Sequence, residues 1–161
     1  MTPTLFALLA LCPGRADLAS VVEAVATRYR LDSVALVVLI AAESTCNPAA
    51  RNRRSGATGL MGILPDGDAN PAHLTTAALM EPGANLDLGA AKLAKLLALC
   101  GGLGQALTLY HGGGKKSLDG RTRCQIDDHA RKLMRRIRWV KMRAERVIVR
   151  TSMLWEQGTR A

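Results

Sequence analysis

A single glutamate follows the longest apolar run of the chain. Residues 34–42 are nine consecutive apolar residues, and Glu43 comes directly after them. A helix that is apolar on every side is buried in the middle of a domain, so we expect the Glu43 carboxyl to enter the interior or a cleft wall. Desolvation there raises the pKa of a carboxyl group, and the negative end of its own helix adds to the rise. A carboxylic acid that stays protonated near neutral pH can protonate a glycosidic oxygen. The alternative is a helix-terminal glutamate that turns outward into water.

Three ordered blocks of residues begin at Glu43. The first contains Glu43-Ser44, then Asn47-Pro48, then SGATGLM at 55–61 and Pro65. The second combines Pro82, Asn85-Leu86, Gly89 and Leu93, and the third is LYHGG at 109–113. Over residues 18–115 this order resembles the soluble lytic transglycosylase (SLT) family of peptidoglycan-cleaving enzymes. The resemblance implies a goose-type-lysozyme-like helical fold.

The resemblance also implies a reaction. The family cleaves the β-1,4 bond between N-acetylmuramic acid and N-acetylglucosamine with one carboxyl group, which here is Glu43. Glu43 would protonate the leaving oxygen and then deprotonate the muramyl C6 hydroxyl, which closes onto C1 as a 1,6-anhydro end. Other glycosidases use a second carboxylate. Asp66 and Asp68 lie in a polar stretch, so a lysozyme-like hydrolase that uses one of them is an alternative.

Further residues take substrate-binding roles by the same resemblance. They are Ser44, Gly59, Met61, Gly62, Tyr110 and His111. Each also has a structural interpretation, such as a helix C-cap for Ser44, core filling for Met61 and Tyr110, or a turn for Gly59. We interpret Asn85 as the N-cap of its helix rather than as a ligand, and His73 and His129 as structural or surface residues.

The chain departs from the family pattern in three places. Gly62 stands where the family has glutamine, and His111 stands where it has asparagine. The tyrosine that usually closes the domain is not evident around residues 127–133. These differences favour altered efficiency or substrate preference over a different reaction. They also leave open a catalytically weak structural or adaptor protein that keeps the fold.

Cys12, Cys46, Cys100 and Cys124 are the four cysteines. They form no C-x-x-C pair and no zinc-binding pattern with histidine, so no metal is expected, and no cofactor motif is complete. Two disulfides or four buried thiols fit the even count, and the scattered spacing favours thiols.

The remaining pattern is that of helices joined by Gly- and Pro-rich loops, which predicts a mainly α fold. Apolar spacing predicts a helix from about residue 18 to 29 with Asp17 as N-cap. Asp32-Ser33 would cap the buried helix that ends near Glu43, and further helices are expected at 85–99 and 103–110. A long loop is expected at 45–71. A heptad-like seam runs along a basic helix from 126 onward, through Leu133, Ile137, Val140, Ala144 and Val147.

The 161-residue chain is long enough for one compact domain, and its charge is uneven. Residues 1–120 hold 10 basic and 9 acidic side chains, whereas residues 121–161 hold 12 and 4. We therefore divide the chain into an apolar N-terminal arm or helix (1–16), a catalytic domain (17–120) and a basic helical segment (121–161). No positive charge precedes the apolar stretch 5–12, which disfavours an export signal there.

The basic segment indicates either a solvated basic face whose seam packs back on the chain's own domain, or an anionic or protein partner. We expect peptidoglycan strands as substrate, other proteins of a larger assembly along the basic helix, non-specific nucleic-acid contact at most, and no membrane span because no apolar run is long enough. The expected setting is a phage virion, at the tail or ejection apparatus, acting on the cell wall. Export to the periplasm, or a secretion-type machine, is the alternative.

Overall fold

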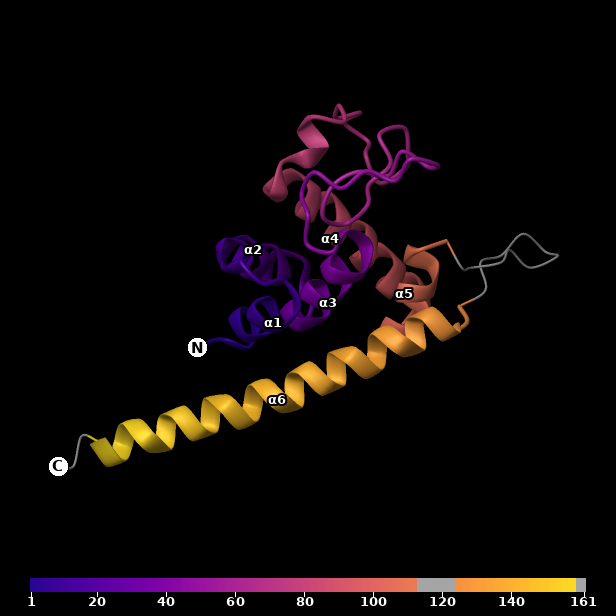
Figure 1. Cartoon of the computed structure of the whole chain (residues 1–161). Helices are drawn as coiled ribbons and strands as arrows, with labels where there is room; N and C mark the ends of the chain where they lie inside the picture. Colours follow the sequence, from indigo (N-terminus) through magenta and orange to yellow (C-terminus); the bar gives the residue numbers. More distant parts are fainter. Residues whose placement is uncertain (113–123, 159–161) are drawn as a thin grey trace.

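The computed structural model describes residues 1–112 and 124–158, with side chains to residue 150. Its helices are α1 (Pro3–Leu11), α2 (Ala19–Tyr29), α3 (Ser33–Ser44), α4 (Pro82–Cys100), α5 (Leu103–Tyr110) and α6 (Asp128–Gly158), with short 3-10 turns η1 (Ala16–Leu18) and η2 (Ala78–Met80) (Figure 1). The described residues contain two isolated β-bridges and no strand. The mainly α prediction is confirmed.

Helix α3 is the centre of the fold. Asp32 caps it as predicted, since its carboxylate accepts from the backbone N–H of Ala35 at 2.9 Å. Residues 34–40 are all buried, and α1, α2 and α6 pack around them. A helix with no polar face has to be surrounded in this way, because any exposed side would leave large apolar side chains in water.

The N-terminal segment is a helix that belongs to the core. Thr2 caps α1, and Ala7 and Leu8 are fully buried against the rest of the core. The prediction that Asp17 caps the next helix is wrong. Asp17 lies inside η1 and pairs with Arg15, and α2 begins at Ala19 after Leu18.

Helix α4 begins earlier than the sequence pattern predicts. Pro82 occupies its first turn, where a missing N–H costs nothing, and Glu81 precedes it. The prediction of Asn85 as N-cap is therefore wrong, because Asn85 lies one turn inside the helix with its side chain fully buried. On the opposite flank Asp87 holds α2, accepting from Arg28 at 2.6 Å and from Tyr29 at 3.0 Å.

The predicted seam of α6 packs on the chain's own core. Of the predicted seam residues, Leu133, Ile137, Val140 and Ala144 are buried and Val147 is half-buried. Ala130 is also buried, and α6 contacts α1, α3 and α5. Lys141 pairs with the Asp32 carboxylate that caps α3. The basic helix is thus attached through its apolar side to the helix that carries Glu43.

Two disulfides replace the four buried thiols that the spacing favours. Cys12, which follows α1, bonds to Cys46, which follows α3. Cys100, the last residue of α4, bonds to Cys124, which precedes α6, so no cysteine is free.

No helix within the described ranges has both the length and the apolar character needed to cross a bilayer.

Candidate active site

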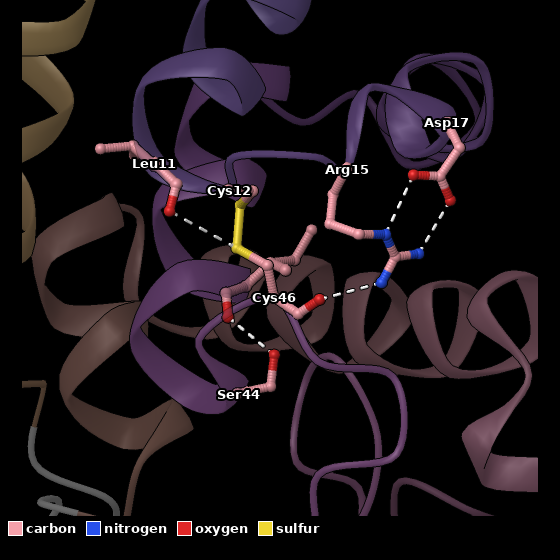
Figure 2. The surroundings of a disulfide bond; sticks show 7 residues. Leu11, Cys12, Arg15, Asp17, Ser44 and Cys46 are labelled. Carbon is pink, nitrogen blue, oxygen red and sulfur yellow. Dashed lines mark hydrogen bonds and ion pairs between the residues drawn. A yellow bond between two sulfur atoms is a disulfide. The ribbon is translucent and has the colours of Figure 1, made fainter.

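Glu43 is the second-to-last residue of α3, and the end of this helix is fastened in three ways. Thr45 and Cys46 adopt left-handed backbone conformations that stop the helix. Cys46 is bonded to Cys12 (Figure 2), and its carbonyl accepts from Nη1 of Arg15 at 3.0 Å. Asp17 holds the same guanidinium at 2.8 Å. The half-buried Glu43 is therefore carried on a helix end with little freedom to move.

The glycine-containing stretch after α3 forms a tight turn. Thr58 and Ile63 exchange two backbone hydrogen bonds of 2.9 Å, which reverses the chain over residues 59–62. The buried Asn85 side chain secures this turn, because its oxygen accepts from Met61 N–H at 2.7 Å and its amide donates to the carbonyls of Thr58 and Leu79. All these bonds are inside the protein, where an unsatisfied polar group is costly. The buried Asn85 side chain thus fixes the turn to α4 and η2 through hydrogen bonds.

Gly62 brings this turn against the catalytic candidate. It has a φ of +61°, and a Cβ atom placed on it would lie 3.3 Å from Oε2 of Glu43. A side chain at position 62 would therefore both strain the backbone and press on the carboxylate. Where the family pattern has glutamine, this chain has no side chain beside Glu43.

Tyr110, the last residue of α5, holds the same turn through a hydrogen bond. Its hydroxyl donates to the Met61 carbonyl at 2.9 Å, and the tyrosine is almost completely buried. Gly89 of α4 permits this approach, since a Cβ there would lie 2.6 Å from that of Met61 and 2.9 Å from the Tyr110 hydroxyl. The glycine of the second block is thus required by packing.

Lys92 is a half-buried cation that the sequence analysis did not single out. Its Nζ donates to the Tyr110 carbonyl at 2.8 Å and lies 4.0 Å from the centre of the Tyr110 ring. Burial lowers the pKa of Lys92, and the nearby Glu43 opposes that effect. Lys92 lies seven residues after Asn85 and three after Gly89, so all three share one face of α4. That spacing is the signal that could have identified it.

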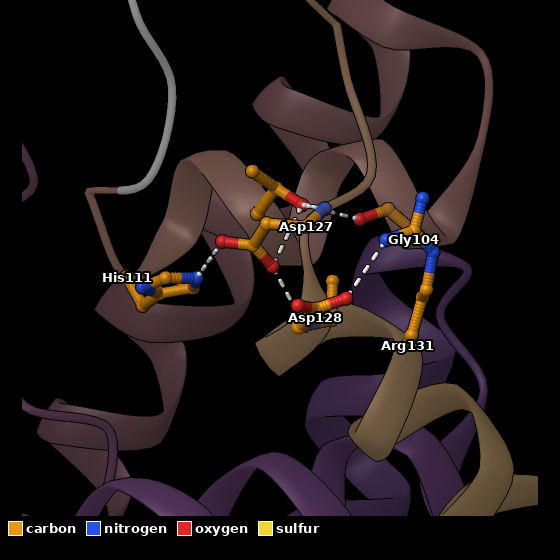
Figure 3. A network of polar contacts seen from close by, with 7 residues as sticks. Gly104, His111, Asp127, Asp128 and Arg131 are labelled. Atoms are coloured by element: carbon orange, nitrogen blue, oxygen red, sulfur yellow. Dashed lines mark hydrogen bonds and ion pairs between the residues drawn. The ribbon is translucent and has the colours of Figure 1, made fainter.

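A second cluster joins α5 to the start of α6. Nε2 of His111 lies 2.7 Å from a carboxylate oxygen of Asp127 (Figure 3), and its ring centre lies 4.4 Å from that of His129. Asp127 caps α6 by accepting from Ala130 N–H at 2.8 Å. The hydrogen bond from Ala130 N–H keeps the pKa of Asp127 below its usual range, and the contact with His111 lowers that pKa further.

The electrostatic balance at Glu43 favours a proton-donating acid. Burial raises the pKa of the Glu43 carboxyl above its ordinary value, while Lys92, and the two histidines when protonated, pull it back. The residues that act on it come from α4, α5 and α6, which converge at the end of α3. A carboxyl group whose pKa is raised by burial keeps its proton to higher pH than an exposed one, which suits a proton donor.

Not all of the predicted site residues lie beside the carboxyl. Gly62 lies against Glu43, while His111 acts on it electrostatically and Tyr110 orders the turn next to it. Ser44 is buried and donates to the Ile40 carbonyl at 3.0 Å, which is a helix-end role (Figure 2). Met61 is fully buried, and Gly59 faces Asn85 and Leu79. Lys92, Asp127 and His129 are the residues that the sequence analysis did not place in the site.

Replacing Lys92 with methionine is expected to shift the pH dependence of activity. The Lys92 charge lowers the pKa of Glu43, so its removal raises that pKa, and Glu43 then stays protonated to higher pH. The high-pH limb of the rate profile should therefore move upward. Lys95→Met, at an exposed position one turn along α4, is the matched control and should leave the limb in place. An unchanged limb in Lys92→Met would contradict the assignment.

The fold and the site define a helical domain built around one half-buried acid at the end of its central helix. The family model described as Transglycosylase SLT domain matches residues 20–128, and the chain belongs to this family. Membership implies lytic-transglycosylase-type activity on peptidoglycan at the level of the family. No curated protein matches the chain.

Proposed function

We propose that this protein is a lytic transglycosylase that cleaves the β-1,4 bond between N-acetylmuramic acid and N-acetylglucosamine. The protonated Glu43 donates its proton to the glycosidic oxygen as the bond to C1 breaks. The resulting carboxylate then takes the proton of the muramyl C6 hydroxyl while that oxygen bonds to C1. The product carries a 1,6-anhydro end, and Glu43 is protonated again for the next cycle.

The observation that carries this proposal is the position of Glu43. Its carboxyl is half-buried at the rigid end of α3, its pKa is raised by burial, and the turn beside it has no side chain at Gly62. An acid of this kind is required in the first step and a base in the second, and one group performs both.

The surroundings support an intramolecular reaction over hydrolysis. Among the described residues, the charged groups that act on Glu43 are Lys92, His129 and His111, all of them basic. The nearby Asp127 carboxylate is engaged by His111 and by the first turn of α6. Asp66 and Asp68, the second carboxylates of the hydrolase alternative, are exposed and are not among those groups. A retaining or inverting hydrolase needs a second carboxylate across the scissile bond. The C6 hydroxyl of the substrate removes that need.

We further propose that the enzyme opens the cell wall locally, in a phage virion or secretion-type machine or as an exported periplasmic protein. The two disulfides support a place of action outside the reducing cytosol, because disulfides persist in oxidising compartments. All three settings share that property.

Digestion of purified peptidoglycan, followed by mass spectrometry of the fragments, tests the reaction. We expect anhydro-muramyl products from the wild-type protein and none from Glu43→Gln. Reducing-end products would replace the proposal with a hydrolase. An absence of products from the folded wild-type protein would instead favour a structural protein that keeps the fold.

A further inference from the structure

The side of α6 that faces away from the core has its own pattern. At 100° per residue, the side opposite the buried seam carries Arg135, Trp139, Met142 and Arg146, with Arg138 at its edge. All five are exposed. We call these five residues the outer stripe. Figure 1 shows the other helices gathered along one side of α6.

The outer stripe has an excess of positive charge. Between residues 128 and 150, α6 holds nine basic side chains and two acidic ones. Arg131 pairs with Asp128 and Lys141 with Asp32. In the described part of the chain, no carboxylate lies within ion-pair distance of Arg135, Arg138 or Arg146. Charge of this density and of one sign is complementary to an anionic surface.

Two large apolar side chains lie in the middle of this charge. Trp139 is 43% exposed and Met142 is 53% exposed, and they are three residues apart on the helix. Arg143 covers one face of the indole, with its guanidinium carbon 4.6 Å from the ring centre. A tryptophan flanked by arginines is suited to the boundary between lipid headgroups and acyl chains, where its apolar body and its polar N–H are both satisfied.

We propose that the outer stripe binds the surface of an anionic lipid bilayer, with α6 lying in the plane of that surface. The arginines contact lipid phosphates, and Trp139 and Met142 enter the headgroup region. A nucleic acid or wall polymer would engage the arginines but leave Met142 in water, so the apolar pair favours lipid. The buried seam on the opposite side of α6 keeps the rest of the domain on the side of the helix that faces away from the membrane.

This docking goes beyond the proposed activity and does not depend on it. The N-terminal end of α6 lies beside α5, where His129 and His111 act on Glu43. A bound helix would therefore hold the Glu43 end of the domain at a constant distance from the membrane. Glu43→Gln should bind vesicles as the wild-type protein does, which keeps failure of one proposal distinct from failure of the other.

The test measures binding of the full chain to vesicles of phosphatidylglycerol and phosphatidylcholine, with pure phosphatidylcholine vesicles as reference. The chain has two tryptophans, so Trp155→Phe leaves Trp139 as the sole indole emitter. We expect binding to the anionic vesicles alone, with a blue shift of the Trp139 emission. Absence of binding, or binding without a blue shift, would overturn the proposal.

Variants separate lipid docking from simple charge attraction. Each arginine near an anionic surface contributes about fivefold in affinity, so Arg135→Gln/Arg146→Gln should bind about 25-fold more weakly. Arg51→Gln/Arg53→Gln makes the same charge change at two exposed loop positions and should bind nearly as the wild type does. Trp139→Ser should weaken binding by about tenfold. Unchanged binding of Trp139→Ser, together with equal affinity for duplex DNA, would show a polyanion site and contradict the lipid proposal.

Discussion

Replacement of Glu43 by glutamine is expected to lower the rate of peptidoglycan cleavage by at least about 10³-fold. General acid–base catalysis by one side chain contributes roughly 10²–10⁴-fold, and here one carboxyl serves in both steps. The amide keeps the size and place of the carboxyl, so the loss should appear in kcat rather than in substrate binding. Release of soluble fragments, followed over time at equal enzyme concentration, measures the effect.

The same variant is expected to be more stable than the wild type at neutral pH. Burial raises the pKa of Glu43 in the folded protein, so the folded state binds more protons than the unfolded chain between the two pKa values. The wild type therefore loses stability as the pH rises from the unfolded pKa of about 4.3 to the folded pKa. Each unit of difference corresponds to about 1.4 kcal/mol. Glutamine does not ionise and avoids this loss.

Thermal unfolding at several pH values tests this linkage. The Tm advantage of Glu43→Gln should be small near pH 4 and should grow as the pH rises toward 7. Glu145→Gln, at an exposed position on α6, is the matched control and should show no such trend. An inactive variant that is also unfolded, or a Tm difference that does not depend on pH, would contradict the role assigned to Glu43.

Removal of the Cys12–Cys46 disulfide is expected to lower the free energy of unfolding by more than removal of the Cys100–Cys124 disulfide does. The bond closes 34 residues, and the loop-entropy relation gives about 3–4 kcal/mol for a loop of that length. This is a large fraction of the stability of a small domain, which is about 5–15 kcal/mol. Because Cys46 lies three residues after Glu43, Cys12→Ser/Cys46→Ser should also lose activity at temperatures where it is still folded.

Denaturant unfolding with and without a reductant measures this effect. Cys100→Ser/Cys124→Ser, which opens a 24-residue loop at the far end of α4, gives a comparison of about 3.4 kcal/mol by the same relation. Thiol titration of the untreated wild-type protein should find no free thiol, and four after reduction under denaturing conditions. Free thiols in the oxidised protein, or a Cys12→Ser/Cys46→Ser variant as stable as the wild type, would show that this disulfide does not secure the end of α3.

Several features of the protein follow from the sequence alone because they depend on neighbouring residues. The apolar run before Glu43 predicts a buried helix, and the structure confirms it. The cap at Asp32 and the bounds of α5 are also correct, because a helix N-cap and a Gly-Gly break act over a single turn. The three motif blocks identify the family, which the match over residues 20–128 confirms. Asp17 and Asn85 are wrong as caps because aspartate and asparagine suit both caps and other polar roles, and local pattern does not separate them.

Other features were decided by the tertiary structure. The four cysteines allow more than one pairing, and the chain path selects Cys12–Cys46 and Cys100–Cys124. The seam of α6 could have bound another chain, but α1, α3 and α5 cover it. Lys92 reaches the Tyr110 carbonyl and the neighbourhood of Glu43 only because α4, α5 and α3 converge there. A periodic pattern shows which side of a helix is apolar, whereas the partner of that side depends on how segments far apart in sequence pack together.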